Sequence, residues 1–470
     1  MKKHILLISG MFLLSGCSFL NQDPNIPEIK VPITSTATNE EKALLNDKWW
    51  ENFNDTKLNS FVEYALENNS DLQSALIKVE KFREFLNIKK SEQLPKIDAY
   101  ADADKKRISK LAPPSYQGMT YESYDLGLSA SFEIDLFGKL SNAKKAAFED
   151  MMNQNYLKEL LYQRVISDSI IAYYGLKSNQ ALYNKTQQQY LDEEETYNNI
   201  KTRYENGFID RSTLLQEESL FEMTRDNMLA QKEVLDNYKT AVSILIGKDV
   251  NEVFEASNIK VEDTQYDSMN LPVPVNLPSD ILNKRADIQA AQSKVKASAF
   301  SVSVAKSAYF PTFSLTGSLG YVSGDLDKLV RSDASSYTIG GNLLSPILDF
   351  GKINANVENA KKDQQLALIE YRDTIRNAFG DIKNALVSYS TNKERFIAQE
   401  RRYDAIKEKK DISKNQYESG YISYLEFLEV RKEEASVGMQ KERIKFEALK
   451  SAVNLYYNLG GGFEAKINEK

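Results

Sequence analysis

The stretch YDLGLSASFEIDL, residues 124–136, places an apolar residue at every even position and a small or acidic residue at every odd position after Tyr124. A period of two sustained this long predicts a β-strand with one apolar and one polar face. The same alternation recurs over 312–322 and, less cleanly, over 336–345 and 97–107. Such strands fit a half-buried sheet in a soluble domain or a tilted bilayer crossing of about 9–11 residues. We favour the crossing, because the strands lie between long helical segments and no other apolar layer is available to cover them.

The two halves of the chain repeat one another. Three segments recur at a spacing of 213 to 216 residues: LENNSDLQSA (66–75) as LNKRADIQAA (282–291), FGK (137–139) as FGK (350–352), and YENG (204–207) as YESG (417–420). Internal similarity at a near-constant offset predicts two copies of one structural plan. We place the first repeat at 58–247, the linker at 248–277, the second repeat at 278–460 and a C-terminal tail at 461–470.

Long helices follow the second strand of each repeat. No proline lies between Pro114 and Pro272, and none follows Pro346. Helices are predicted over about 139–206 and 352–418, each with a mostly apolar stripe at seven-residue spacing that is typical of coiled-coil packing. A helix of this length measures about 100 Å at about 1.5 Å per residue. Gly207 and Gly420, just beyond the two helices, are predicted to form C-terminal turns at their tips.

The N-terminus has the features of a bacterial export signal. Two lysines precede an apolar run over 5–14, which is too short to span a bilayer, and the run ends in Leu-Ser-Gly-Cys17. Small residues before a cysteine resemble a lipobox, so residues 1–16 are predicted to be removed and Cys17 acylated. The alternative is an ordinary cleavage site with a chance cysteine. We favour the lipobox, because the only cysteine of the chain lies where that chemistry needs it. Acyl chains on Cys17 would supply a stable anchor, and residues 17–57 would form the acylated leash and the start of the folded body, its equatorial region.

The composition excludes several classes of function. The chain has one histidine, His4, and one cysteine, Cys17, so nearly all of it lacks imidazole and thiol groups. We therefore predict no catalytic residues, no metal site and no cofactor other than covalent lipid on Cys17. A net charge of −7 argues against nucleic acid as a partner. No phosphate-binding GxxxxGK[ST] motif is present, so any step that requires energy must draw it from a partner.

The lipobox, the duplicated strand–strand–helix plan, and the FGK and YExG motifs together resemble the TolC-like outer-membrane factors, also called outer membrane efflux proteins. The closest resemblance is to the lipoprotein branch that serves RND-type multidrug and metal efflux pumps. WWxxFxDxxL at 49–58 and RADI at 285–288, where the branch usually has RPDI, support it. The resemblance implies a mixed α and β fold in which a homotrimer shares a 12-stranded outer-membrane β-barrel and an α-helical periplasmic tunnel.

The resemblance also implies a location and partners. The protein is expected in the cell outer membrane, lipid-anchored and extending into the periplasm. Its expected partners are two further copies of itself, a periplasmic adaptor protein, an inner-membrane RND-type pump and outer-membrane lipid. The tips at Gly207 and Gly420 are the expected docking region for the adaptor.

The resemblance places a periplasmic gate just past the second tip. The matching positions are Leu425, Glu426, Glu429 and Lys432. In a trimer the two glutamates would form carboxylate rings that attract cations. The alternative, and the usual explanation for two glutamates three residues apart, is a solvated helix face. On the strand 124–136, we expect Asp125, Glu133 and Asp135 to line the lumen.

The predicted function is that of a passive, gated exit duct for drugs or other small toxic solutes, the outer-membrane channel of a tripartite efflux system. Two alternatives remain at this point. One is a protein-secretion conduit of the same family, and the other is a structural lipoprotein whose coiled coils tether the outer membrane. An enzyme is not expected, because it would rest on carboxylates and tyrosines alone, and no catalytic arrangement of them stands out.

Overall fold

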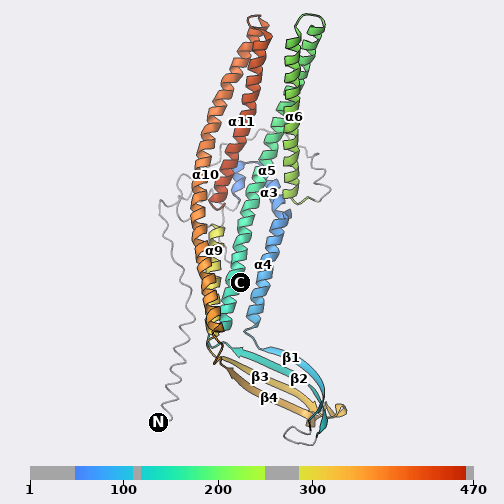
Figure 1. The fold of residues 1–470 in the computed structure, drawn as a ribbon, viewed down its shortest axis with the longest axis vertical. Coiled ribbons are helices and arrows are strands. Elements are labelled where there is room, and N and C mark those ends of the chain that lie inside the picture. Colours follow the sequence, from blue (N-terminus) through green and yellow to red (C-terminus); the bar gives the residue numbers. More distant parts are fainter. Residues whose placement is uncertain (1–47, 110–117, 249–284, 462–470) are drawn as a thin grey trace. The chain divides into compact units, whose positions relative to one another are not determined.

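The computed structural model describes residues 48–109, 118–248 and 285–461 (Figure 1). These residues group into two compact units. The sheet unit comprises Ile77–Asn155 and Ala290–Asp373, and the helical unit comprises the described residues of Lys30–Leu76, Tyr156–Gln289 and Thr374–Lys470. Each unit contains segments from both sequence repeats. A repeat therefore gives the order of strands and helices, but it does not fold as a compact unit of its own.

The sheet unit contains one antiparallel sheet in the order β1-β2-β3-β4. The strands are β1 (Lys96–Arg107), β2 (Thr120–Ile134), β3 (Thr312–Ser323) and β4 (Ser335–Leu344). They lie where the alternating segments predict them. The main difference is at β2, which begins four residues earlier than predicted and ends before Asp135 and Leu136.

The register aligns the alternation of all four strands. Residues directly opposite one another share a face. One such row joins Ile97, Ala130, Gly317 and Ile339, and the next joins Ala99, Leu128, Leu319 and Tyr337. The opposite face carries Asp98, Ser129, Ser318 and Thr338 in one row and Asp102, Asp125 and Val322 in another. The predicted apolar and polar faces are thus confirmed, and the apolar one is open, with Ile339 86% and Leu319 66% exposed.

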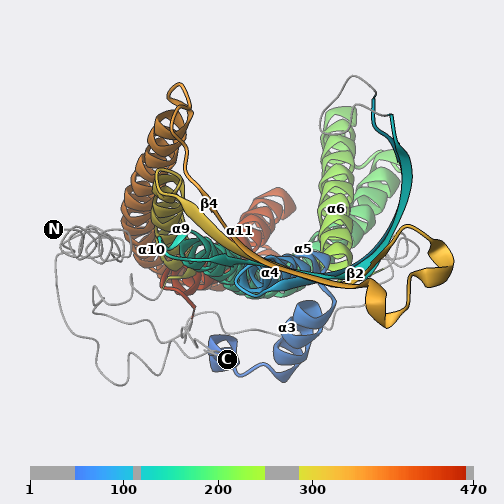
Figure 2. The same ribbon diagram turned by 90° about the horizontal axis from the view of Figure 1, so that it is seen from below.

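Two glycines allow β2 and β3 to approach closely. Gly127 and Gly320 are paired in the register, and a Cβ on Gly127 would lie 2.7 Å from the carbonyl oxygen of Leu319. The hydroxyl of Tyr100, on β1 opposite Gly127, would lie 2.8 Å from that Cβ, so the tyrosine covers the gap that the glycine leaves. The sheet is visibly curved (Figure 2), and glycines in strand interiors are typical of such bends.

Six long helices account for most of the remaining described residues: α4 (Ser70–Ser91), α5 (Lys139–Glu205), α6 (Arg211–Leu245), α9 (Ala286–Ser307), α10 (Lys352–Glu418) and α11 (Tyr424–Asn458). α5 and α10 each have 67 residues. Tyr190 and Tyr197, seven residues apart on α5, belong to its predicted stripe and both stack on Phe221 of α6. Tyr417, in the stripe of α10, stacks on Phe427 of α11. Among the described helices, none is both long and apolar enough to cross a membrane.

The core of the helical unit is built on the WWxxFxDxxL motif. The short 3-10 helix Trp49–Phe53 and α3 (Thr56–Asn68) bury Trp49, Trp50, Leu58 and Val62 against α5 and α11. The ring of Trp49 stacks on Tyr456 with centroids 4.8 Å apart. Arg285 of the RADI motif is buried, forms a two-bond ion pair with Asp287 and donates to the carbonyl oxygen of Asn458. Both motifs therefore act in packing.

Candidate functional site

The candidate site lies at the tip end of the helical unit, where α5 turns into α6 and α10 into α11. Both turns close in the same way. Gly207 has a φ of +75° and Gly420 a φ of +77°, and a Cβ on either would meet nothing within 4 Å. Glycine is thus favoured at both positions because the backbone is left-handed there, and not because a side chain would lack space. The bonds Phe208 N–H to Arg203 O and Tyr421 N–H to Gln416 O complete the same cap at each tip, so the predicted C-terminal turns are confirmed.

The second tip begins α11 with a capping box. The Ser423 hydroxyl accepts from the backbone N–H of Glu426, and the Glu426 carboxylate accepts from the backbone N–H of Ser423 at 2.7 Å. The Ser423 hydroxyl also donates to the Glu426 carboxylate at 2.9 Å, and the two hydrogen bonds that this carboxylate accepts from Ser423 lower the pKa of Glu426. Glu426 therefore has a structural role that the gate prediction missed. The signal was present in the sequence, since Ser-x-x-Glu before an apolar residue is typical of a capping box.

The other predicted gate residues lie on the first turns of α11. The side chains of Leu425, Glu429 and Lys432 are exposed, and Leu425 is 49% exposed. The positions 213 residues earlier are Ser212, Thr213, Gln216 and Ser219, matching Leu425, Glu426, Glu429 and Lys432 in that order. The two tips thus share their backbone plan, but the charges predicted to form the gate occur on the second tip only.

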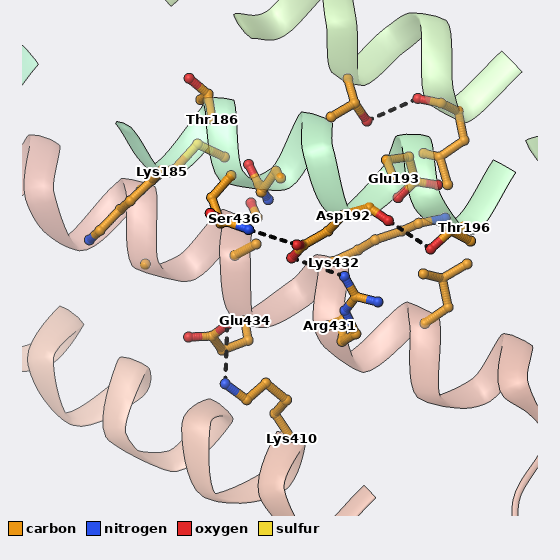
Figure 3. A pocket seen from close by; sticks show the side chains of 18 of the residues that line it. Lys185, Thr186, Asp192, Glu193, Thr196, Lys410, Arg431, Lys432, Glu434 and Ser436 are labelled. Atoms are coloured by element: carbon orange, nitrogen blue, oxygen red, sulfur yellow. Dashed lines mark hydrogen bonds and ion pairs between the residues drawn. The ribbon is translucent and has the colours of Figure 1, made fainter. Parts of the chain in front are cut away.

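Two polar contacts join the start of α11 to α5. The Tyr424 hydroxyl donates to Thr196 Oγ1 at 3.1 Å. The Arg431 guanidinium lies 3.3 Å from Asp192 Oδ2, as Figure 3 shows. Burial raises the pKa of Tyr424, and its hydrogen bond to Thr196 partly offsets this. We call these two contacts the α5–α11 link. They were not predicted, because sequence alone does not show which turns of two helices far apart in the chain face each other.

A cavity of about 970 Å³ opens among α5, α6, α10 and α11 beside this link. Its wall is mixed, with apolar side chains such as Leu220 and Met439 and charged side chains of both signs: Lys185, Asp192, Glu193, Glu195, Lys410, Lys414, Arg431, Lys432 and Glu434. Figure 3 shows Arg431 pointing toward Asp192 and Lys410 toward Glu434. The Lys410 ammonium lies 3.7 Å from the Glu434 carboxylate. Several of the basic groups are therefore already paired within the helical unit.

The residues predicted to line a lumen differ in their surroundings. Asp125 accepts a hydrogen bond from Ser123 on the polar face of the sheet, and Glu133 forms an ion pair with Lys139 at 3.0 Å. Asp135 lies beyond the end of β2, where it accepts from the backbone N–H groups of Leu140 and Ser141. It therefore caps the start of α5 and is not part of the strand. Cys17 lies outside the described residues, so its lipidation stays a prediction.

A sheet with one apolar and one polar face and two long helical hairpins with capped tips also occur in proteins of known class. The sequence profile described as "Outer membrane efflux protein" matches residues 61–248 and 277–461. The chain belongs to the outer membrane efflux protein family. Its relatives include the probable efflux pump outer membrane protein TtgC of Pseudomonas putida, 26% identical over 98% of this chain and 96% of that protein. The probable outer membrane lipoprotein SilC of Salmonella typhimurium is also 26% identical, over 98% of this chain and 99% of its own length.

Solved structures agree with this assignment. The Campylobacter jejuni CmeC outer membrane channel matches with a TM-score of 0.84 and 29% identity, covering 94% of this chain and 95% of that chain. The TolC-like fold predicted from the sequence is thus confirmed. This outer membrane efflux protein is a channel component located in the outer membrane.

Proposed function

We propose that three copies of this chain form the exit duct of a tripartite efflux system and that the second helix tip gates it. One observation carries the proposal. The sheet has an exposed apolar face, and no strand of the described residues pairs with the outer edge of β1 or β4. Unpaired strand edges are not tolerated in lipid, so other copies must complete them. Three copies would pool 12 strands, enough to close around a water-filled path along the polar face.

The gate is proposed at Leu425, Glu429 and Lys432, with Glu426 contributing charge in addition to its capping role. Carboxylates repeated around a threefold axis would favour cations and repel anions at the narrowest point. The α5–α11 link would hold this tip closed, because Tyr424 and Arg431 tie the first turns of α11 to α5. Breaking the link frees the tip without touching the gate residues themselves.

The cargo class and the partners are proposed from the relatives. TtgC is named for an efflux pump, and other relatives from Pseudomonas putida are named for antibiotic, toluene and solvent efflux. We propose small toxic organic solutes as cargo and a periplasmic adaptor with an inner-membrane pump as partners. The adaptor would contact the tip turns at Gly207 and Gly420. The duct itself would be passive, with no catalytic step of its own.

The test uses the full-length protein purified from outer membranes in detergent. Light scattering should give about three times the 53.4 kDa of one chain, less the signal peptide. In planar bilayers, Tyr424→Phe with Arg431→Ala should raise the single-channel conductance several-fold. The matched control is Lys409→Ala. It breaks the exposed ion pair of 2.9 Å between Lys409 on α10 and Glu433 on α11, and it should leave conductance unchanged. A monomer in detergent, or equal conductance in all variants, would overturn the proposal.

A further inference from the structure

Two glutamates are buried against one another where α5 packs on α6. Glu193 of α5 is 6% exposed and Glu217 of α6 is 4% exposed. Phe221, one turn beyond Glu217, stacks on Tyr190 and Tyr197, which flank Glu193, so the two carboxyl groups lie in one contact between α5 and α6. The Oε1 atom of each glutamate is buried and has no hydrogen-bond partner in the described chain. Burying two ionised carboxylates without partners is costly, so one of them is expected to hold a proton.

Burial is the main reason why the pKa of Glu193 is raised to about 7, and the neighbouring carboxyl group of Glu217 adds to it. The positive charges of Lys432 and Arg431 on α11 act in the opposite direction without cancelling this effect. Arg431 is already paired with Asp192 on α5. A buried carboxyl pair of this kind retains one proton well above the usual range of a glutamate.

The remaining groups around the pair do not neutralise it either. Tyr424 of α11 faces it as a neutral phenol. Lys410 and Lys414 of α10 line the adjoining cavity, where Lys410 pairs with Glu434 and Lys414 with Glu418. From α5, Glu195 adds a further negative charge to the cavity wall. The residues that α6 contributes to that wall are uncharged: Leu220, Met223, Thr224 and Asn227.

A metal ion does not fit the pair. Two carboxylates offer at most four oxygen ligands, whereas Ca²⁺ takes about 6–8 and Mg²⁺ about six in a strict octahedron. Across the described ranges, no group of three or more histidine, cysteine, aspartate or glutamate side chains could hold a metal ion. The ligand that suits this site is a proton.

We infer that Glu193 and Glu217 bind a single proton that holds α5 and α6 together, and that loss of this proton pushes the two helices apart. The position of Glu193 on α5 couples this proton to the α5–α11 link. Glu193 is next to Asp192 and three residues from Thr196, which together form the α5 side of the α5–α11 link. Repulsion between Glu193 and Glu217 would therefore strain the stretch of α5 that holds the start of α11.

The direction of the pH effect follows from the pKa. Because the folded pKa of Glu193 lies above its ordinary value of 4.5, the contact is fully stable below that value and weakens as pH rises through about 7. The α5–α6 contact should be closed under mildly acidic conditions and loosened under mildly alkaline ones.

Hydrogen exchange on the purified full-length protein tests this inference. Protection factors, which correct for the intrinsic pH dependence of exchange, would be compared at about pH 6 and about pH 8 for peptides covering 186–200 and 213–224. In the wild type they should fall about tenfold or more between the two values. In Glu217→Gln they should stay constant, because the neutral amide donates to Glu193 without needing a proton. Glu218→Gln, the exposed neighbour on the same helix, is the matched control and should behave like the wild type.

Infrared spectra provide a second readout that does not depend on exchange. The wild type should lose a protonated-carboxyl band between the two pH values, and in Glu217→Gln that loss should move to lower pH, because Glu217 no longer raises the pKa of Glu193. An equal fall in protection in Glu217→Gln and wild type, or a carboxyl band with the same pH dependence in both, would overturn the inference. Both measurements follow the α5–α6 contact and not transport, so failure here leaves the proposed function standing, and the reverse also holds.

Discussion

The ammonium of Lys177 on α5 lies 3.2 Å from the carboxylate of Asp55, and the Lys177 side chain is only 9% exposed. The same carboxylate accepts from the Tyr173 hydroxyl at 3.2 Å and from the backbone N–H groups of Lys57 and Leu58, which begin α3. One side chain thus caps α3 and binds it to α5. This explains the aspartate of the WWxxFxDxxL motif as a packing residue.

Replacing Asp55 should destabilise the helical unit strongly. Asp55→Ala leaves the buried Lys177 without its partner and α3 without its cap, and should lower the free energy of unfolding by about 3–5 kcal/mol. Lys177→Met keeps the aliphatic stem and removes the charge, so its cost should be smaller, on the order of 1–2 kcal/mol. Urea unfolding of the purified protein, followed by circular dichroism, measures both. Lys48→Ala, which breaks the exposed pair with Glu63, serves as the control and should stay within about 0.5 kcal/mol of wild type.

Asp55 should also contribute to the acid stability of the protein. Burial favours a higher pKa for its carboxyl, but the hydrogen bond from Leu58 N–H and the charge of Lys177 outweigh it and lower the pKa. The stabilisation should be complete above the ordinary value of 3.8 and be lost as pH falls through the lowered one. Melting temperatures measured across the acid range should therefore fall more steeply for wild type than for Asp55→Asn. Parallel curves would contradict this explanation.

Gly320 of β3 should be intolerant of any side chain. A Cβ there would meet the carbonyl of Leu126 and lie 2.7 Å from the Cα of Gly127, and backbone atoms cannot move aside. Gly320→Ala should therefore separate β2 from β3 and reduce assembly into a heat-resistant oligomer on gels. Gly317→Ala, three residues away on the same strand, would place its Cβ 3.6 Å from the nearest atom and should assemble normally. Equal assembly of the two variants would show that the close approach is not required.

The charge of Glu426 can be separated from its capping role. Glu426→Gln retains a capping side chain at the third helical position, whereas Glu426→Ala loses both charge and cap at a cost of about 1 kcal/mol. If the tip is the gate, Glu426→Gln and Glu429→Gln should each weaken cation block and raise single-channel conductance in planar bilayers, with melting temperatures unchanged. Conductance that changes only in Glu426→Ala would assign the effect to the lost cap and remove Glu426 from the gate.

Cys17 should carry the lipid anchor. Cys17→Ser removes the only thiol in the chain, so labelling of the expressed protein with radioactive palmitate should be abolished. The signal peptide of the variant should also remain uncleaved, which increases its mass. Continued labelling of Cys17→Ser would contradict the assignment.

The sequence predicts best where one segment determines its own structure. Alternation over 124–136 and the absence of proline after Pro114 and Pro346 were enough for the strands and the long helices. The caps at Asp135 and Glu426 are local and can be predicted from the sequence, but an acidic residue at either position suits a lumen or a gate equally well. The burial of Glu193 was not readable. It lies in the run Glu193-Glu194-Glu195, and only the packing of α6 on α5 decides which of the three is buried.

The stacking of Trp49 on Tyr456 bears on when this protein can fold. These residues come from opposite ends of the described chain, and both belong to the core that includes α3, α5 and α11. That core cannot close until the last helix has been synthesised, and folds dominated by such distant contacts form slowly. A chain bound for the outer membrane must first cross the inner one. The late meeting of its two ends would keep it unfolded during translocation and delay folding until export is almost complete.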